Sequence, residues 1–365
     1  MTTIQSVECT LYRIPLAEVL SDAKHGDHTH FELIVVAISS ADGLIGHGYT
    51  YTGGYGGQAI LSMLKADLVP ALIGEDCSGV EQLHEKLRWR VHYVGRGGIA
   101  SFALSAIDIA LWDLRCRRSE KSLWRYLDGT TNTTRVYAGG IDLNFSLEKL
   151  LAQTQGYLDR GFAHIKIKVG LPRLEDDLNR AAAVKKMIGD GQIMVDANYG
   201  MEIEQATEAA MGFGELGVLW FEEPIIPDDY TGYATIADAT GTPLAMGENL
   251  HTLEEFALAF QYSKLAFIQP DASNCGGITG WLAVAEMARE AGIPICSHGM
   301  QELHVSLMAS QEHAGYLEAH SFPIDEYTHR PLVLHEHLAV APDSPGTGVE
   351  FRFDALEPFR VAAFS

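Results

Sequence analysis

Cysteine is scarce in this sequence, and no pairing pattern connects the few residues present. The 365 residues include five cysteines, an odd number, widely separated and without a C-x-x-C spacing. A disulfide framework or a thiolate zinc site needs paired or closely spaced cysteines, so the sequence predicts neither. The N-terminus also lacks the basic start and apolar stretch of a secretory signal. A reducing cytosol, and therefore a cytoplasmic location, is the expectation.

Basic residues and long apolar runs are scarce too. Lysine and arginine number 26 against 48 acidic residues, which gives a formal net charge of −22. A chain of this charge repels the phosphates of nucleic acids and of anionic membranes, so neither is an expected partner. No apolar run approaches the ~20 residues of a membrane-spanning helix. A small anionic substrate is not excluded, because a local lysine or metal ion can outweigh the global charge.

A phosphate-binding loop is also missing. Residues 52–57 are rich in glycine, but they lack the G-x-x-x-x-G-K-[ST] pattern and its lysine. We therefore predict no nucleotide site there.

Apolar residues are abundant at 47% of the chain, and between residues 166 and 318 they form short runs that each end in a polar residue. Successive run ends lie 20 to 28 residues apart, which fits one strand, one helix and two short loops. Such repeats build a (β/α) barrel, which gathers functional side chains at the C-terminal ends of its strands. Each acidic residue alone could instead cap a helix, but their order favours a shared site. The residues expected at one mouth are Lys168, Asp196, Glu222, Glu248, Asp271, His298 and Glu318.

The residues before the barrel predict a smaller α+β domain. An antiparallel meander is expected, with a polar loop at residues 16–31 and strands at 7–14, 32–39 and 44–51. Helices are expected at residues 58–72, 80–91 and 99–117. The predicted organisation is a first domain at 1–130, a barrel at 131–330, and a C-terminal segment at 331–365 that returns to the first domain.

Lys166 and Lys168 alternate with apolar residues, so both lysines project from the same face of one strand. A strand in a parallel barrel is covered on both faces, so the lysine face should point into the barrel. An exposed edge strand protected by its lysines is the alternative.

Asp196, Glu222 and Glu248 end three consecutive predicted strands. Three neighbouring carboxylates repel one another unless a cation joins them, and an all-oxygen set suits Mg²⁺. We predict one Mg²⁺ per subunit on these residues, with Asn198 and Glu223 orienting them. Three separate helix caps or salt bridges are the alternative.

Asp271 and His298 end neighbouring predicted strands. A carboxylate that accepts a hydrogen bond from one imidazole nitrogen fixes the tautomer and leaves the other nitrogen free to transfer protons. We therefore predict an Asp271–His298 pair in preference to an isolated structural histidine.

These groups together suit the removal of a proton next to a carboxylate. Lys168 and His298 are expected on opposite sides of the mouth, where each can act on one face of the substrate. The pKa of Lys168 should be lowered by Lys166 and the metal. Lys166 and the metal would neutralise the enediolate that forms. Glu318, if protonated, could donate a hydrogen bond to the substrate carboxylate.

With these residues in this order, the sequence resembles the enolase superfamily, and within it the mandelate racemase subgroup. The shared features are the Lys166-x-Lys168 pair, the three acidic residues, the Asp271–His298 pair and Glu318. The resemblance covers nearly the whole chain. It implies an α/β fold: a (β/α)7β modified TIM barrel with an N-terminal α+β capping domain that is completed by the C-terminal segment. It also implies a homo-oligomer, by analogy alone.

In the enolase superfamily the cap chooses the substrate, through loops that correspond here to residues 16–30 and 49–57. The stretch from Ser21 to His25 resembles the acid-sugar dehydratases that act on galactarate and talarate. Polar loops of this kind suit hydroxyl groups and a distal carboxylate. The substrate-binding residues implied are Asp22, Lys24, His25, Tyr51 and Asn198.

The leading hypothesis is a Mg²⁺-dependent dehydratase of a polyhydroxylated mono- or diacid. Lys168 or His298 would remove the α proton, and His298 would protonate the departing β-hydroxyl, which yields a 2-keto-3-deoxy acid. The alternative is a racemase or epimerase of a 2-hydroxy acid, in which the two residues exchange protons on opposite faces. A barrel that binds ligand without turnover is disfavoured by the complete set of acid, base and metal residues.

Overall fold

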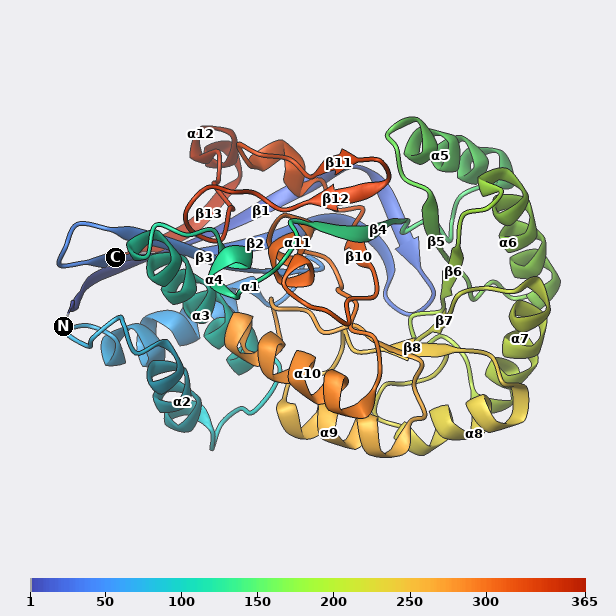
Figure 1. The fold of residues 1–365 in the computed structure, drawn as a ribbon, viewed down its shortest axis with the longest axis horizontal. Coiled ribbons are helices and arrows are strands. Elements are labelled where there is room, and N and C mark those ends of the chain that lie inside the picture. The colour runs from blue at the N-terminus through green and yellow to red at the C-terminus, as the bar shows by residue number, and fades with distance from the viewer. Residues whose placement is uncertain (1) are drawn as a thin grey trace.

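The computed structural model describes residues 2–365, which form a sheet-and-helix cap beside a barrel (Figure 1). The cap sheet has the order β13-β1-β2-β3. Three of its strands form the predicted meander: β1 (Ile4–Asp22), β2 (Gly26–Ser40) and β3 (Ile45–Thr52). Their pairing is antiparallel throughout.

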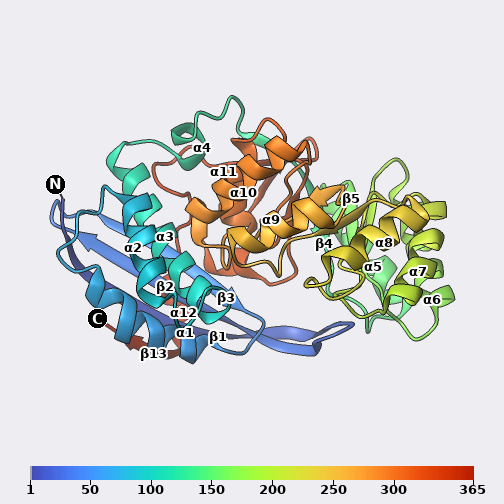
Figure 2. The same cartoon turned by 90° about the horizontal axis from the view of Figure 1, so that it is seen from below.

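The predicted polar loop at 16–31 is wrong, because β1 and β2 continue through it as a hairpin. The register breaks between Pro15 and Leu20 and then resumes, so that Asp22 pairs with Gly26. Asp22 Oδ1 accepts the backbone N–H groups of Lys24 and His25 and thereby closes the turn. A two-stranded ribbon that extends beyond its sheet needs no apolar face, so polar composition did not reveal these strands. Figure 2 shows the hairpin reaching from the cap sheet alongside the barrel.

Helices α1 (Gly57–Met63) and α3 (Ile99–Arg118) cover one side of the cap sheet. Helix α2 (Val80–Val91) packs on α3, and the short α4 (Leu123–Tyr126) contacts α3 and α11 (Gln301–Ala309). The helix expected at 58–72 is α-helical only to Met63 and continues as π and 3-10 turns to Ala71. The central helix α3 packs on β3, where a Cβ atom at Gly48 would lie 2.1 Å from the Ala106 carbonyl oxygen. Glycine there permits this close approach.

The barrel strands follow one another in parallel, and β10 closes the ring by pairing with β4. They are β4 (Thr133–Gly139), β5 (His164–Lys168), β6 (Ile193–Asp196), β7 (Phe221–Glu222), β8 (Leu244–Met246), β9 (Phe267–Ile268) and β10 (Leu317–Ala319). Between β9 and β10, Ile295 bridges to Ile268 and Ala314 and supplies the remaining strand position. The predicted (β/α)7β barrel with an N-terminal cap is confirmed.

Seven helices connect the barrel strands: α5 (Leu147–Asp159), α6 (Leu174–Ile188), α7 (Ile203–Leu216), α8 (Tyr230–Thr240), α9 (Leu253–Tyr262), α10 (Gly277–Ala291) and α11 (Gln301–Ala309). Helix α9 begins with the capping box of Thr252 and Glu255, and Ser146 caps α5. Because these helices cover the outside of the barrel, its strands are buried on both faces.

The C-terminal segment contacts both parts of the molecule. β11 (Val333–His335) and β12 (Leu338–Val340) form a hairpin on barrel strand β4, so this first part of the C-terminal segment joins the barrel. After α12 (Phe353–Leu356), β13 (Arg360–Phe364) pairs with β1 of the cap sheet. The domain boundaries at 130 and 330 stay predictions.

Within residues 2–365, none of the helices combines the length and the apolar character that crossing a membrane requires.

Candidate active site

Three carboxylates come together at the C-terminal mouth of the barrel. Asp196 ends β6 and Glu222 ends β7, and the parallel register places them side by side. Glu248 follows Gly247, which has a φ of 146° and packs so closely on the Gln269 backbone that no side chain would fit. One carboxylate oxygen from each of the three residues lies within 4.8 Å of the others. The structure therefore brings together the residues predicted to bind Mg²⁺.

Lys166 and Lys168 are buried in the barrel interior, as expected of a strand covered on both faces. Lys166 Nζ lies 2.5 Å from Glu222 Oε1 and 2.8 Å from Glu318 Oε1. Lys168 Nζ lies 2.5 Å from Asp196 Oδ2. Burial lowers the pKa of both lysines, but the carboxylates outweigh it and raise both values. Lys166 lowers the pKa of Lys168, as expected, but Asp196 outweighs this effect and holds the proton on the amine. The lowering by a bound metal stays a prediction.

His298 and Asp271 lie together, with His298 Nδ1 2.9 Å from Asp271 Oδ2. The Tyr51 hydroxyl donates to the same oxygen at 2.8 Å. An ionised carboxylate only accepts, so Nδ1 carries a proton, and Nε2 lies 3.4 Å from Glu248 Oε2. Burial lowers the pKa of His298, but neighbouring carboxylates, Glu248 first among them, raise it to about 10. These carboxylates therefore favour the protonated form of His298.

Glu318, in the centre of β10, is ionised. Burial raises its pKa, but Lys166 and His298 lower it well below its usual range. Its oxygens accept hydrogen bonds from Lys166 and from the Gly299 N–H, the latter at 2.9 Å. The expectation that a protonated Glu318 donates to the substrate is therefore wrong for this arrangement, in which Glu318 anchors Lys166.

Asn198 and Glu223 lie beside the three carboxylates in the left-handed backbone region, each with a φ of 38°. Glu223 Oε2 accepts a hydrogen bond from Asn249 Nδ2 at 2.7 Å. By contrast, Asn198 Oδ1, Glu223 Oε1 and Glu248 Oε2 are buried without a donor among residues 2–365. A buried oxygen without a donor costs about 1–3 kcal/mol. This corner of the mouth is therefore suited to a cation.

A cavity of about 550 Å³ opens over these residues, between cap and barrel. The barrel side is lined by Lys168, Asn198, Glu248, Asp271 and His298, and the cap side by Asp22, His25, His28, Tyr51 and Tyr55. Four of the predicted substrate-binding residues thus reach the cavity. Lys24 does not line it, because its side chain is exposed at the tip of the hairpin.

Two histidines of the cavity wall were missed by the sequence prediction. His320 follows β10, and its Nδ1 accepts the Phe322 N–H at 3.2 Å, so the proton of the neutral ring is on Nε2. Burial lowers its pKa to about 3. Period-two alternation from Glu318 would have placed His320 on the same inward face. His28 was left out, although Asp22 and His25 of the same segment were included, because the strand pairing that brings it beside Asp22 was not predicted.

The tip of the β1–β2 hairpin sits against two barrel loops. A Cβ atom at Gly170 or Gly200 would lie 2.7 or 2.8 Å from the Cβ of Ala23. The Tyr199 hydroxyl, in the loop after β6, is hydrogen-bonded to His25 Nε2. These contacts hold Asp22 and its neighbours over the mouth.

Replacing Gly200 by alanine is expected to lift this tip, because the new Cβ meets Ala23. We expect KM for the substrate to rise about tenfold, equivalent to ~1.4 kcal/mol, with kcat and Tm nearly unchanged. Steady-state kinetics and thermal melts measure this. Gly156→Ala in α5 is the matched control, since a Cβ there meets nothing within 4 Å. Equal KM values for wild type and Gly200→Ala would show that the contact between Gly200 and the hairpin tip does not position the cap residues for substrate binding.

Chelator-treated protein is expected to lose stability as the pH rises above neutrality. The folded-state pKa of His298, about 10, exceeds its ordinary value of 6.5, so this stabilisation is complete below pH 6.5 and lost by about pH 10. Burial raises the pKa of Glu222 to about 8, which acts in the same direction, because the folded state again binds more protons. Calorimetry should show Tm falling by on the order of 5 °C over this range. The Tm of the His298→Asn variant should fall less over the same range. If Tm depended on pH as steeply in this variant as in wild type, His298 would not be the origin of the effect.

The fold and site together define a capped (β/α)7β-barrel enzyme with a carboxylate cluster, paired lysines and an Asp–His pair at its mouth. Residues 149–355 match the family described as enolase C-terminal domain-like, and residues 20–128 match the N-terminal domain of mandelate racemase / muconate lactonizing enzyme. The chain belongs to the enolase superfamily, as its sequence predicted. Membership supports an enzyme with magnesium-dependent catalysis.

Relatives similar over their full length differ in substrate. The 3,6-anhydro-alpha-L-galactonate cycloisomerase of Streptomyces coelicolor is 42% identical over 97% of this chain and 98% of that protein. A racemase from Streptomyces coelicolor A3(2) with bound magnesium superposes with a TM-score of 0.95 at 42% identity, covering 98% of this chain and 100% of that one. L-talarate/galactarate dehydratase from Salmonella typhimurium LT2, liganded with Mg and L-lyxarohydroxamate, superposes with a TM-score of 0.95 at 30% identity. The superposition covers 100% of this chain and 94% of that one. These relatives support the reaction class of the superfamily and leave the substrate of this chain open.

Proposed function

We propose that this protein is a Mg²⁺-dependent enzyme that removes the proton α to the carboxylate of a sugar acid and eliminates the oxygen from the β carbon. The observation that carries this is one cavity in which Lys168 and the Asp271–His298 pair flank a cluster of three carboxylates. If the departing oxygen is a hydroxyl, the reaction is a dehydration. If it is the ring oxygen of a 3,6-anhydro sugar acid, the ring opens and the product is an isomer.

The residues present fit a magnesium ion. Asp196, Glu222 and Glu248 offer hard oxygen ligands within 4.8 Å of one another, and Glu248 Oε2 has no hydrogen-bond donor among residues 2–365. The bound ion would supply positive charge that stabilises the negative charge developing on the substrate carboxylate as the α proton leaves. The relatives crystallised with magnesium support this choice of ion.

Three side chains at the mouth of the barrel are proposed to have separate roles in the reaction. Lys168 is the proposed base for the α proton, because its amine lines the cavity and a cation on Asp196 would weaken the contact that holds the amine's proton. His298 lies across the mouth from Lys168, on the other flank of the α carbon. Lys166 stays charged between Glu222 and Glu318 and adds to the stabilisation of the developing negative charge.

The cavity favours an acid with a single carboxylate. Lys168 is the one lysine or arginine among its lining residues, within the part of the chain that the structure describes, and Asp22 and Asp27 line the cap side. Burial raises the pKa of Asp22, but hydrogen bonds from His25 and His28 lower it below its usual range. A second carboxylate at this end would meet no lysine or arginine among the lining residues. Aldonates and anhydro-aldonates therefore suit the cavity better than the galactarate-like diacids that the loop resemblance implied.

The test compares 3,6-anhydro-L-galactonate, galactonate and galactarate with saturating Mg²⁺, and follows the 2-keto product by NMR. We expect kcat/KM for a monoacid to exceed that for galactarate by at least ~100-fold, since a carboxylate buried without a cationic partner costs several kcal/mol. A preference for galactarate would contradict the single-carboxylate argument. If α-proton exchange in deuterated water occurred with inversion and without C–O cleavage, the racemase alternative would replace elimination.

A further inference from the structure

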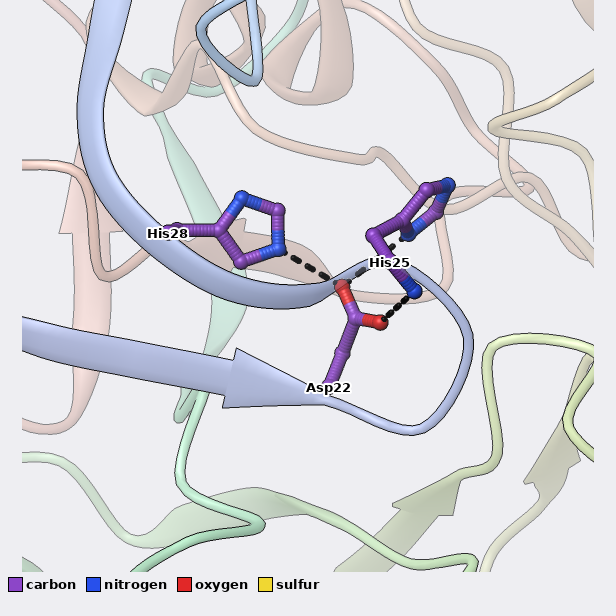
Figure 3. A group of neighbouring side chains, drawn as sticks. All are labelled: Asp22, His25 and His28. Atoms are coloured by element: carbon purple, nitrogen blue, oxygen red, sulfur yellow. Dashed lines mark hydrogen bonds and ion pairs between the residues drawn. The ribbon is translucent and has the colours of Figure 1, made fainter.

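Asp22, His25 and His28 form a second carboxylate–imidazole group, on the cap side of the cavity (Figure 3). Asp22 Oδ2 lies 2.8 Å from His28 Nε2 and 3.0 Å from His25 Nδ1. Asp22 Oδ1 accepts two backbone N–H groups, at 3.0 and 2.6 Å. The buried carboxylate is ionised and only accepts, so each ring donates a proton to it. Four donors satisfy Asp22 completely, and the group needs no metal ion.

The two histidines differ in what their second ring nitrogen does. His25 Nε2 is bonded to the Tyr199 hydroxyl, so both of its nitrogens are engaged. His28 Nδ1 has no hydrogen-bond partner among residues 2–365, and the side chain, 12% exposed, lines the cavity. Gly53 lies next to this edge of the ring, and its lack of a side chain keeps the edge open, since a Cβ there would contact Nδ1 at 3.6 Å. His28 thus repeats the arrangement of His298: one nitrogen fixed by a carboxylate and the other free in the cavity.

The two free nitrogens face different ends of a bound acid. His298 Nε2 lies 3.4 Å from Glu248 Oε2 and 4.0 Å from Glu318 Oε2, among the groups that would hold the substrate carboxylate and its α carbon. The β oxygen lies further from that carboxylate, and in a 3,6-anhydro acid it remains bonded to the far end of the molecule. The cap side of the cavity is where that oxygen would lie, and His28 is there.

We propose that His28, held by Asp22, is the acid that protonates the oxygen leaving the β carbon. The C–H electron pair at the α carbon becomes the new C=C bond, and the C–O pair leaves with the oxygen, which takes the proton from His28 Nδ1. The imidazolium becomes a neutral imidazole and regains its proton from solvent. This inference rests on the proposed elimination, and it leaves His298 to serve the α carbon.

The test is His28→Asn in deuterated water with 3,6-anhydro-L-galactonate and Mg²⁺. We expect product formation to fall by about 10²- to 10⁴-fold, the range of general acid catalysis, while deuterium still enters the α position at a rate within about tenfold of wild-type turnover. The variant should eliminate fluoride from a 3-deoxy-3-fluoro aldonate at nearly the wild-type rate, because fluoride departs without a proton. His30→Asn is the matched control: His30 lies on the same strand, and its ring nitrogens contact Thr29 and the Gly54 carbonyl.

Parallel loss of oxygen and fluoride elimination in His28→Asn would overturn the proposal, because it would show that His28 only positions the substrate. Elimination within about threefold of wild type would overturn it as well. Failure of the proposed function is seen separately, as a wild-type protein that exchanges no α proton from any of these acids, and that outcome would overturn both inferences.

Discussion

Replacing Lys168 by alanine is expected to lower kcat by about 10³-fold at saturating Mg²⁺, with a much smaller change in KM. The amine lies in the cavity, 2.5 Å from Asp196, and no other lysine or arginine among the described residues lines it. Removal of the side chain therefore leaves the α proton without its base. Exchange of that proton into deuterated water should be lost to the same extent as product formation, which stopped-flow or NMR kinetics can measure.

The matched control for this variant is Lys264→Ala. Lys264 pairs with Asp238 at 2.5 Å on the exposed surface, and such pairs contribute about 1 kcal/mol or less. The activity of the Lys264→Ala variant should equal that of wild type. If Lys168→Ala lost product formation but kept α-proton exchange, His298 would be the base, and the two flanks of the cavity would exchange their proposed roles.

The positions of the catalytic groups were predictable because a barrel has a strict geometry. Alternation put Lys166 and Lys168 on one face of β5, and burial of that strand on both sides left only the interior for them. The spacing of Asp196, Glu222 and Glu248 likewise required neighbouring strand ends. These inferences needed only periodicity and topology, both of which the sequence carries directly.

The charge states were not predictable in the same way, because they depend on distances of a few ångströms. The pKa of Lys168 is raised because Asp196 Oδ2 approaches within 2.5 Å, a contact that no spacing rule supplies. Glu318 is ionised because Lys166 turns toward it as well as toward Glu222. Sequence identifies the members of such a network, but the pairing among them follows from the packed structure.

The cap side of the site was the least predictable part. Polar composition at residues 16–31 predicted a loop, whereas strand pairing of Leu20 with His28 continues the hairpin over the mouth. Because the loop assumption ignored alternation, His28 was not placed beside Asp22. The homo-oligomer implied by the resemblance stays a prediction, since one chain does not test it.

Removal of divalent cations is expected to reduce turnover by at least ~10³-fold, and added Mg²⁺ should restore it. The three carboxylates otherwise interact with Lys166 and Lys168, whose pKa values they raise. A cation on these carboxylates competes with the lysine protons. Mg²⁺ binding should therefore release protons, and its affinity should increase with pH, because fewer protons then have to be displaced.

Titration calorimetry in two buffers of different ionisation enthalpy measures the released protons without relying on activity. Trp220 offers a second readout, since its Nε1 donates to Glu222 Oε2 at 2.8 Å in the barrel core, so its emission should change when Glu222 binds the ion. Trp220→Phe should remove that change and keep the binding heat. Asp196→Asn should weaken Mg²⁺ binding and abolish turnover together. Full activity in excess chelator, or an affinity independent of pH, would refute the competition between the cation and the lysines at these carboxylates.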